Sequence, residues 1–224
     1  AGVHELGLNY RLTANRNVGK GVFAVDPPDA TDHLFGGFVQ DHITLRDALH
    51  LTVGTKLEHN DFTGFEIQPS ARLAWDLSAT QTVWGAISRA VRVPTRLERD
   101  IAIDVTDPTA DPVVRLLGNR DFNSEKLLAY ELGYRWQATP RLAIDLASFL
   151  NRYSGLASLE FGTPFVDPRD GKTVVPVVNQ NLTDGRAAGV EALVTFSPLE
   201  SWRLTVGYSN LSLKIGPHGQ DINP

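Results

Sequence analysis

The residues that could carry out chemistry in this chain are scattered histidines and one acidic segment. No pair of the six histidines has the spacing of helical metal ligands, and no cysteine is present to complete a zinc site. Asp100, Asp104, Asp107 and Asp111 could offer calcium their carboxylate oxygens, but the segment lacks the glycine and closing glutamate of an EF-hand loop. Nucleophile-elbow and phosphate-loop motifs are also missing. We therefore expect no enzyme activity, no cofactor and no metal site.

Other charged side chains occur inside segments that alternate between apolar and polar residues. In residues 49–59 the odd positions are mostly apolar and the even positions mostly polar, and residues 64–77 repeat the pattern. A period of two indicates a β-strand whose two faces meet different surroundings. The polar residues that we assign to the interior of such a sheet are Gln40, Glu58, Glu66, Arg72, Glu131, Arg135, Glu191 and Arg203.

The charges on these polar faces restrict the possible folds. Unpaired charges are costly to bury, so a small closed barrel with this face inward is excluded. A wide barrel, either filled with water or closed by a polar plug, would accommodate them. A soluble sheet with the charged face in solvent and the apolar face on a core would do so equally well. Periodicity alone does not separate these two folds.

The elements that would position these residues are about nine long strands, and no amphipathic helix is evident. Their lengths of roughly 11–15 residues exceed the usual 5–6 and suffice to cross a membrane. The expected strands cover residues 3–13, 33–46, 49–59, 64–77, 80–93, 128–137, 141–152, 186–197 and 202–209.

The connections between these strands differ in length in an ordered way. Tight turns are expected near residues 46–47, 78–79, 138–140 and 198–200, and most of the other connections are long, at 14–32, 94–124 and 153–185. Outer-membrane barrels have this asymmetry of short periplasmic turns and long extracellular loops. Four aromatic residues near the tight turns match the girdle of a bilayer interface: Trp75, Trp136, Phe196 and Trp202.

Composition excludes several other classes of protein. A net charge of −5 argues against a nucleic-acid-binding protein. The chain has 42% hydrophobic and 21% charged residues, which excludes a disordered protein. No apolar run approaches the roughly 18–20 residues of a membrane helix. The chain starts at Ala1 and contains no methionine, so we expect a processed or recombinant chain, or part of a longer one.

Six fragments in order resemble the barrel region of TonB-dependent receptors, the outer-membrane transporters of Gram-negative bacteria. The first fragment joins residues 37–45 (GFVQDHITL) to residues 51–58 (LTVGTKLE) and is similar to the family's FVQDEITL, turn, LTLGLRYE. The others are 68–75 (QPSARLAW) for SPRLGL, 88–95 (SRAVRVPT) for SRGFRAPS, 118–125 (GNRDFNSE) for GNPDLKPE, 130–135 (YELGYR) for YELGYK, and Asn181 to Glu191 for N...GVE.

The resemblance implies an all-β, transmembrane antiparallel barrel of roughly 22 strands. Residues 1–224 would then be an incomplete central part of that barrel domain, without the plug domain, the coupling box or the last strands. The intact protein would take up a scarce nutrient across the bacterial outer membrane, in contact with its lipid. A ferric siderophore is the substrate class expected first, with cobalamin, haem and oligosaccharides as alternatives. Energy would come through TonB acting on the missing N-terminal plug.

The long connections are the candidate sites of substrate recognition. A localised positive field there would attract an anionic metal chelate, and the candidate residues are Arg96, Arg99, Arg115 and Arg120. Two other classes of protein remain open at this stage. One is a soluble all-β module that binds carbohydrate, and the other is a passive porin or an outer-membrane enzyme.

Overall fold

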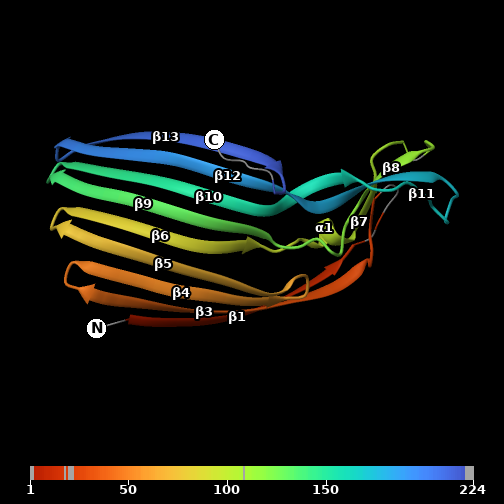
Figure 1. Ribbon diagram of the computed structural model, residues 1–224, viewed down its shortest axis with the longest axis horizontal. Coiled ribbons are helices and arrows are strands. Elements are labelled where there is room, and N and C mark those ends of the chain that lie inside the picture. Colours follow the sequence, from red (N-terminus) through yellow and green to blue (C-terminus); the bar gives the residue numbers. More distant parts are fainter. Residues whose placement is uncertain (1–2, 18, 20–22, 108, 220–224) are drawn as a thin grey trace.

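The computed structural model describes residues 3–17, 19, 23–107 and 109–219, and the statements below refer to these. Nine long strands run side by side in one antiparallel sheet, in the order β1, β3, β4, β5, β6, β9, β10, β12, β13 (Figure 1). They are β1 (Val3–Arg16), β3 (Asp29–Arg46), β4 (Leu49–Asn60), β5 (Gly64–Ser78), β6 (Gln81–Arg92), β9 (Glu125–Thr139), β10 (Leu142–Phe161), β12 (Thr173–Leu199) and β13 (Trp202–Pro217).

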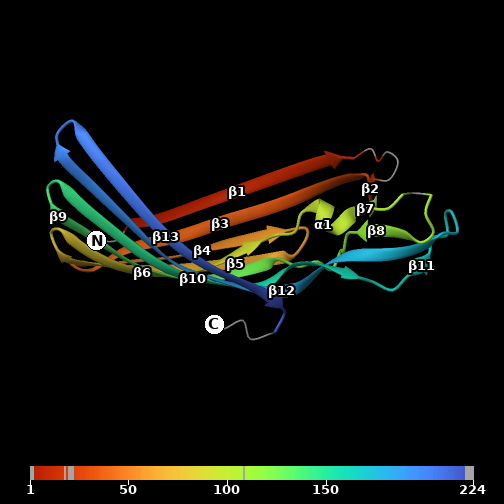
Figure 2. The ribbon, with the colours of Figure 1, turned by 90° about the horizontal axis from the view of Figure 1, so that it is seen from above.

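The sheet curls into a trough, with β1 and β13 at its two edges (Figure 2). This confirms the predicted all-β slice of a barrel wall. The tight turns between β3 and β4, β5 and β6, β9 and β10, and β12 and β13 all lie at one end of the strands (Figure 1). We call this the turn end. The long connections lie at the other end, as the sequence predicted.

The strand register sorts the side chains onto two unlike faces. Leu57 lies opposite Ile67 and Leu49 opposite Trp75, so the odd positions of β4 and β5 share one face. Large apolar side chains on this outer face are exposed, and Ile67, for example, is 55% exposed. An apolar surface of this extent on one side of a curled sheet is suited to lipid, not to water.

The fully buried apolar residues lie beyond the wall, at the end opposite the turns. The short elements gather at this end: β2 (Phe23–Val25), α1 (Arg96–Asp100), β7 (Ile101–Asp104), β8 (Val113–Leu117) and β11 (Phe165–Val166) (Figure 2). Val113, Phe122 and Val174 are at most 1% exposed, and Val113 lies directly opposite Val174. We call this set of short elements, with the parts of β10 and β12 that reach it, the cap.

The structure differs from the sequence prediction in how far the strands extend. Residues 153–185, expected as a loop, are mostly strand, because β10 continues to Phe161 and β12 begins at Thr173. β8 pairs with the start of β12 in parallel, with Val174 opposite Val113. These extensions lie above the apolar part of the wall, so they have no lipid-facing side and do not alternate in the way that marked the lower strands. Among the described residues no helix is long and apolar enough to cross a membrane.

Candidate functional site

All eight polar residues assigned to the interior lie on one face of the sheet. The register links them across neighbouring strands: Glu58 lies opposite Glu66, Glu131 opposite Ala86, and Arg135 opposite Asp145. The same alternation places Gln40, Arg72, Glu191 and Arg203 on this inner face. The inner face is therefore the polar face of the trough. Asp145 of β10 lies on the same inner face, and its carboxylate accepts a hydrogen bond from Arg135 at 2.5 Å.

Two of the interior acids face each other at close range. Glu58 and Glu66 are directly opposite on β4 and β5, and both are buried. Like charges in this position repel. Each carboxylate has a cation beside it, since Lys56 Nζ lies 2.6 Å from Glu58 and an Arg89 Nη atom lies 3.7 Å from Glu66. The two cations offset the repulsion, so the acids fit the wall without a bound metal.

Aromatic rings on the inner face cover glycines of the adjacent strand. Trp84 lies opposite Gly133 and its indole occupies the space where a side chain of Gly133 would be. The guanidinium carbon of Arg72 lies 4.2 Å from the centre of the Trp84 ring, in cation–π contact. The same aromatic-over-glycine pairing joins Phe38 to Gly7 and Phe149 to Gly189. In each pair the aromatic ring occupies the space that a side chain of the glycine would fill.

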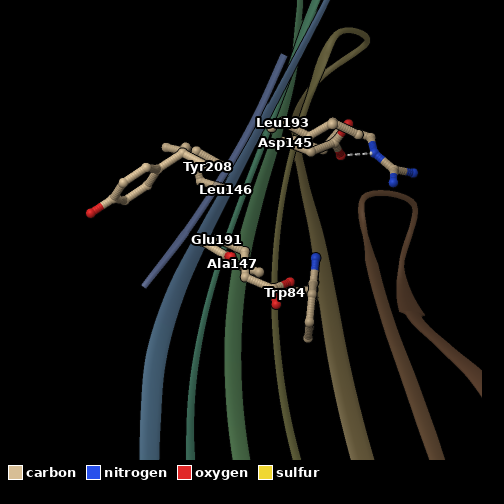
Figure 3. A pocket seen from close by; sticks show the side chains of 11 residues that line it. Trp84, Asp145, Leu146, Ala147, Glu191, Leu193 and Tyr208 are labelled. Atoms are coloured by element: carbon tan, nitrogen blue, oxygen red, sulfur yellow. Dashed lines mark hydrogen bonds and ion pairs between the residues drawn. The ribbon is translucent and has the colours of Figure 1, made fainter. Parts of the chain in front are cut away.

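A hollow of about 500 Å³ lies on the inner wall near the turn end. Figure 3 shows Trp84, Asp145 and Glu191 on one side of the sheet and the Tyr208 ring on the other. The hollow thus presents an indole and carboxylates to whatever fills the trough. Tyr208 faces the lipid side.

A second, more enclosed cavity of about 280 Å³ lies where the cap meets β1 and β3. Its lining combines Arg11, Asn15 and Asp32 from the wall with Thr95 and Arg96 from the cap. Polar wall residues and a cap segment thus enclose a space at the end of the trough that holds the long connections. Its enclosure and mixed polar lining make it a candidate ligand cavity.

The cap is fixed to the wall by charged hydrogen bonds. Arg92, at the end of β6, lies 2.8 Å from Glu98 of α1 and 2.7 Å from Glu125 of β9. Thr95 caps α1, and the Glu98 carboxylate accepts in return from the Thr95 backbone N–H at 2.7 Å. Burial is the largest single effect on Glu98 and opposes its ionisation, but the hydrogen bonds from Arg92 and Thr95 together outweigh it, so the pKa of Glu98 is lowered. α1 is therefore anchored at its first turn.

Each of the four predicted substrate-contact arginines lies in the cap and has partners within the chain. Arg96 donates to the carbonyl of Pro27, and Arg99 donates to the carbonyl of Phe62 at 2.9 Å. Arg120 lies 3.4 Å from Asp100 and is 65% exposed. Arg96 and Arg115 are each 8% exposed, so Arg120 is the most accessible of these three.

Arg115 belongs to a buried ion cluster that joins two long connections. It contacts Asp104 and lies 2.6 Å from Asp167, which also binds Arg169 at 2.6 Å. Asp167 is 3% exposed, and hydrogen bonds from Arg169 and Arg115 lower the pKa of its carboxyl. Residues 52 positions apart in sequence are thereby held together. The sequence carried no local signal for this pairing, or for the role of Arg92, because each partner lies on a distant segment.

The family described as TonB dependent receptor-like, beta-barrel, matches residues 2–223. The chain belongs to the TonB-dependent receptors. It is part of the barrel domain of an outer-membrane family whose members are transporters, not enzymes, which excludes the soluble module and the enzyme considered above.

The receptor barrel is similar to proteins connected with iron. An "Iron-regulated outer membrane virulence protein" of Vibrio cholerae serotype O1 is 24% identical over 178 residues, which is 78% of this chain and 26% of the relative. A ferric enterobactin receptor (PfeA) mutant of Pseudomonas aeruginosa matches with a TM-score of 0.75 at 17% identity, over 94% of this chain and 32% of that one. The siderophore receptor PirA from Pseudomonas aeruginosa matches with a TM-score of 0.75 at 19% identity, over 96% and 40%.

The matches also define how much of a receptor this chain represents. It spans about a quarter of the length of the curated relatives that it matches, and about a third of the PfeA chain. At these identities the solved structures establish the fold alone. Substrate, energy coupling and partners of the whole protein are therefore treated as proposals below.

Proposed function

We propose that the full-length protein takes up a ferric siderophore across the outer membrane, with energy supplied through TonB. One observation supports the substrate class above the others: the similar structures are described as siderophore or ferric enterobactin receptors, and the curated relative as iron-regulated. Cobalamin, haem and oligosaccharide are alternative substrates for the same type of barrel. In this proposal the chain supplies a central part of the barrel, and contact with TonB is made by a plug region elsewhere in the protein.

In this proposal the two faces of the trough have different roles. The outer face contacts the membrane lipid with its apolar side chains, while the inner polar residues face the plug and the passing substrate. Gln40, Arg72, Glu131 and Glu191 would act mainly by setting the wall's polarity and packing. The 280 Å³ cavity beside Arg11 would receive part of the substrate before it reaches the plug.

The loop arginines have unequal roles in the proposal. Arg96, Arg99 and Arg115 donate to carbonyls and carboxylates of the chain, so they chiefly hold the cap in shape. Arg120 is exposed and is the best candidate for first contact with an anionic iron chelate. A fixed positive charge at the mouth raises the rate of encounter with such a ligand.

The substrate class is tested in cells that lack their other iron receptors and express the full-length protein. Uptake of radioactive iron from a panel of purified ferric siderophores is measured beside haem, cobalamin and an oligosaccharide. We expect at least one ferric siderophore to be taken up, and uptake to stop when the tonB gene is deleted. Uptake of only a non-siderophore substrate, or uptake that persists without TonB, would contradict the proposal.

The proposed role of Arg120 has its own matched experiment. Arg120→Gln in the full-length receptor is compared with Arg46→Gln, an equally charge-changing substitution of an exposed residue at the turn end. We expect roughly three- to tenfold slower association of the ferric siderophore for Arg120→Gln and no change for the control. Equal association rates for the two variants would show that Arg120 does not contact the substrate.

A further inference from the structure

The inner face changes character along β13. Its inward residues are polar or glycine from Arg203 to Ser209, and Ser209 lies opposite the inner-face residue Glu191. The next three inward residues are apolar: Leu211, Leu213 and Ile215. Over the same stretch the outward residues are polar: Asn210, Ser212 and Lys214. The period of two continues, but apolar and polar residues exchange faces at the upper end of β13.

Two neighbouring strands extend this apolar surface (Figure 1). The β12 residues directly opposite the three apolar residues of β13 are all small: Gly185, Ala187 and Gly189. On β10, the strand beyond, the Phe149 ring covers Gly189, and Tyr153 lies opposite Gly185. We define the inner apolar strip as Leu211, Leu213 and Ile215 with Phe149 and Tyr153.

The β13 side chains of the inner apolar strip are exposed. Leu211, Leu213 and Ile215 are 62%, 56% and 60% exposed, respectively. Membrane lipid contacts the other face of the wall, so these side chains face the interior of the barrel. Exposed apolar surface is unfavourable in water, and an apolar patch with polar surroundings marks a binding surface. The strip is therefore a candidate binding surface inside the barrel.

The strip lies at the mouth of the trough, toward the end that carries the cap. Leu204 lies opposite Phe196 in the aromatic girdle at the turn end. At about 3.3 Å per residue, β13 rises about 23 Å from Leu204 to Leu211 and about 36 Å to Ile215. With a strand tilt of about 35–45°, these are heights of about 18 Å and about 28 Å, beside the upper edge of an apolar band about 25 Å tall. A ligand that enters the barrel from outside the cell would pass this surface.

A polar surface follows directly below the strip. Ser209 and Glu191 are the next inward residues, and they line the hollow of about 500 Å³ together with Asp145 and Arg135. A ligand lying along β13 would meet apolar side chains at the mouth and charged groups further down. That order matches a molecule with an alkyl chain joined to a polar head.

The chemistry of the strip favours an alkyl chain over a protein segment. A peptide would bring backbone N–H and C=O groups that need hydrogen-bond partners when they are buried. The side chains of Leu211, Leu213 and Ile215 offer none, and the backbone of β12 is already paired with β10 and β13. An alkyl chain needs no such partners, and these three residues give it an apolar track about 13 Å long.

We propose that the inner apolar strip binds the alkyl chain of an amphiphilic ferric siderophore at the mouth of the barrel. This inference rests on the proposed function and narrows its substrate class to chelates that carry a fatty-acyl tail. The tail lies along β13 from Ile215 to Leu211, and the chelate reaches toward the polar hollow below. Burial of alkyl carbon against the strip adds affinity without requiring a charge.

The experiment measures binding to the full-length receptor in lipid nanodiscs, and empty nanodiscs correct for partition of the probe into lipid. The probes are ferric siderophores of the catecholate, hydroxamate and carboxylate types, each as the tail-less parent and with a decanoyl tail. The test variant is Leu211→Ser with Leu213→Ser, because both side chains are exposed and their loss removes little packing. The control, Leu77→Ser with Leu199→Ser, makes the same change at exposed residues near the turn end.

We expect the tail to raise the affinity for at least one siderophore about 30-fold in the wild type and in the control. In the test variant the gain should fall to about threefold, while the tail-less parent binds as it does to the wild type. Leu211→Ile with Leu213→Ile keeps the strip apolar and should keep the full gain.

Three results would overturn the inference in distinguishable ways. If the parent binds but the tail adds nothing, or adds equally in the wild type and the test variant, the strip does not bind the tail and the proposed function stands. Equal weakening of parent and acylated siderophore in the test variant would show that the strip packs against another part of the protein. If no siderophore binds in either form, the proposed function fails, and the inference fails with it.

Discussion

Trp84 covers Gly133, its direct partner on the adjacent strand, on the inner face of the wall. The ring fills the space that a side chain at Gly133 would need, and Arg72 rests on the ring from the β5 side. One glycine thus permits a wide aromatic residue to lie flat between two strands. The pairing relates the choice of glycine in YELGYR to a partner about fifty residues earlier in the chain.

Gly133→Ala is expected to destabilise the barrel. A Cβ at residue 133 would lie less than 3.0 Å from atoms of the Trp84 indole, so the ring or the strand must move. Overpacking of this kind costs about 1–3 kcal/mol. The free energy of unfolding of the full-length receptor in urea, followed by tryptophan fluorescence, measures the effect.

Gly85→Ala is the matched control for that substitution. Gly85 lies on β6 beside Trp84, but a Cβ there would meet nothing closer than 3.7 Å. Alanine at such a site should be neutral or stabilise by about 0.4–1 kcal/mol. If both alanine variants unfold at the same urea concentration, the ring does not depend on Gly133.

Thr95→Ala is expected to loosen α1. The Thr95 side chain accepts from the Glu98 N–H, and loss of an N-cap costs about 1 kcal/mol. Hydrogen exchange of residues 96–100 should therefore accelerate about fivefold, while exchange in β4 stays unchanged. Thr95→Ser keeps the hydroxyl and should exchange like the wild type. Equal protection in the alanine variant would mean that Arg92 and Glu125 hold α1 without its cap.

Asp167→Asn is expected to separate the two long connections of the cap. The substitution removes the negative charge that Arg115 and Arg169 share, and leaves Arg115 buried beside Asp104 alone. Residues 165–173 and 113–117 should both lose protection from hydrogen exchange. Asp121→Asn, a change of an exposed aspartate in the same region, serves as the control. A loss confined to residues 165–173 would show that the cluster does not couple the two segments.

The same carboxylate predicts how the cap responds to pH. Hydrogen bonds from Arg169 and Arg115 lower the pKa of Asp167 from its usual 3.8. Asp167 therefore binds a proton more tightly when residues 165–173 are unfolded than when they are folded. The stabilisation that the ionised carboxylate gives to the folded segment is complete above about pH 4. Protection of residues 165–173, corrected for intrinsic exchange, should be constant from about pH 8 to 5 and fall below about pH 4. Asp167→Asn should lack this acid transition, and an unchanged transition in that variant would assign it to another group.

The wall could be predicted from sequence because each long strand meets lipid on one side and polar surroundings on the other. Because of that contrast, apolar and polar residues alternate in segments such as 49–59 and 64–77. The bounds predicted for these two strands agree with those of β4 and β5 within one residue. Glu58 and Glu66 fall on the inner face by the same alternation. The contrast disappears above the membrane, so the extension of β10 and the start of β12 could not be recognised.

The cap could not be predicted, because its contacts join residues that are far apart in the chain. Arg96 donates to the carbonyl of Pro27 across 69 positions, and Arg115 meets Asp167 across 52. A loop arginine that binds a ligand and one that holds a neighbouring loop look the same in a single sequence. The parallel pairing of β8 with β12 is equally non-local, because no tight turn in the sequence joins the two strands.

β12 belongs to the wall and the cap at once, because it pairs with β10 and β13 below and with β8 and β11 above. The segments of the cap therefore cannot be exchanged one by one between receptors without breaking its pairing. A chimaera that exchanges residues 93–124 alone would present β8 to a foreign edge and Arg115 to a foreign partner. Transferring the cap between receptors of this kind requires residues 93–124 and 153–185 to be exchanged together.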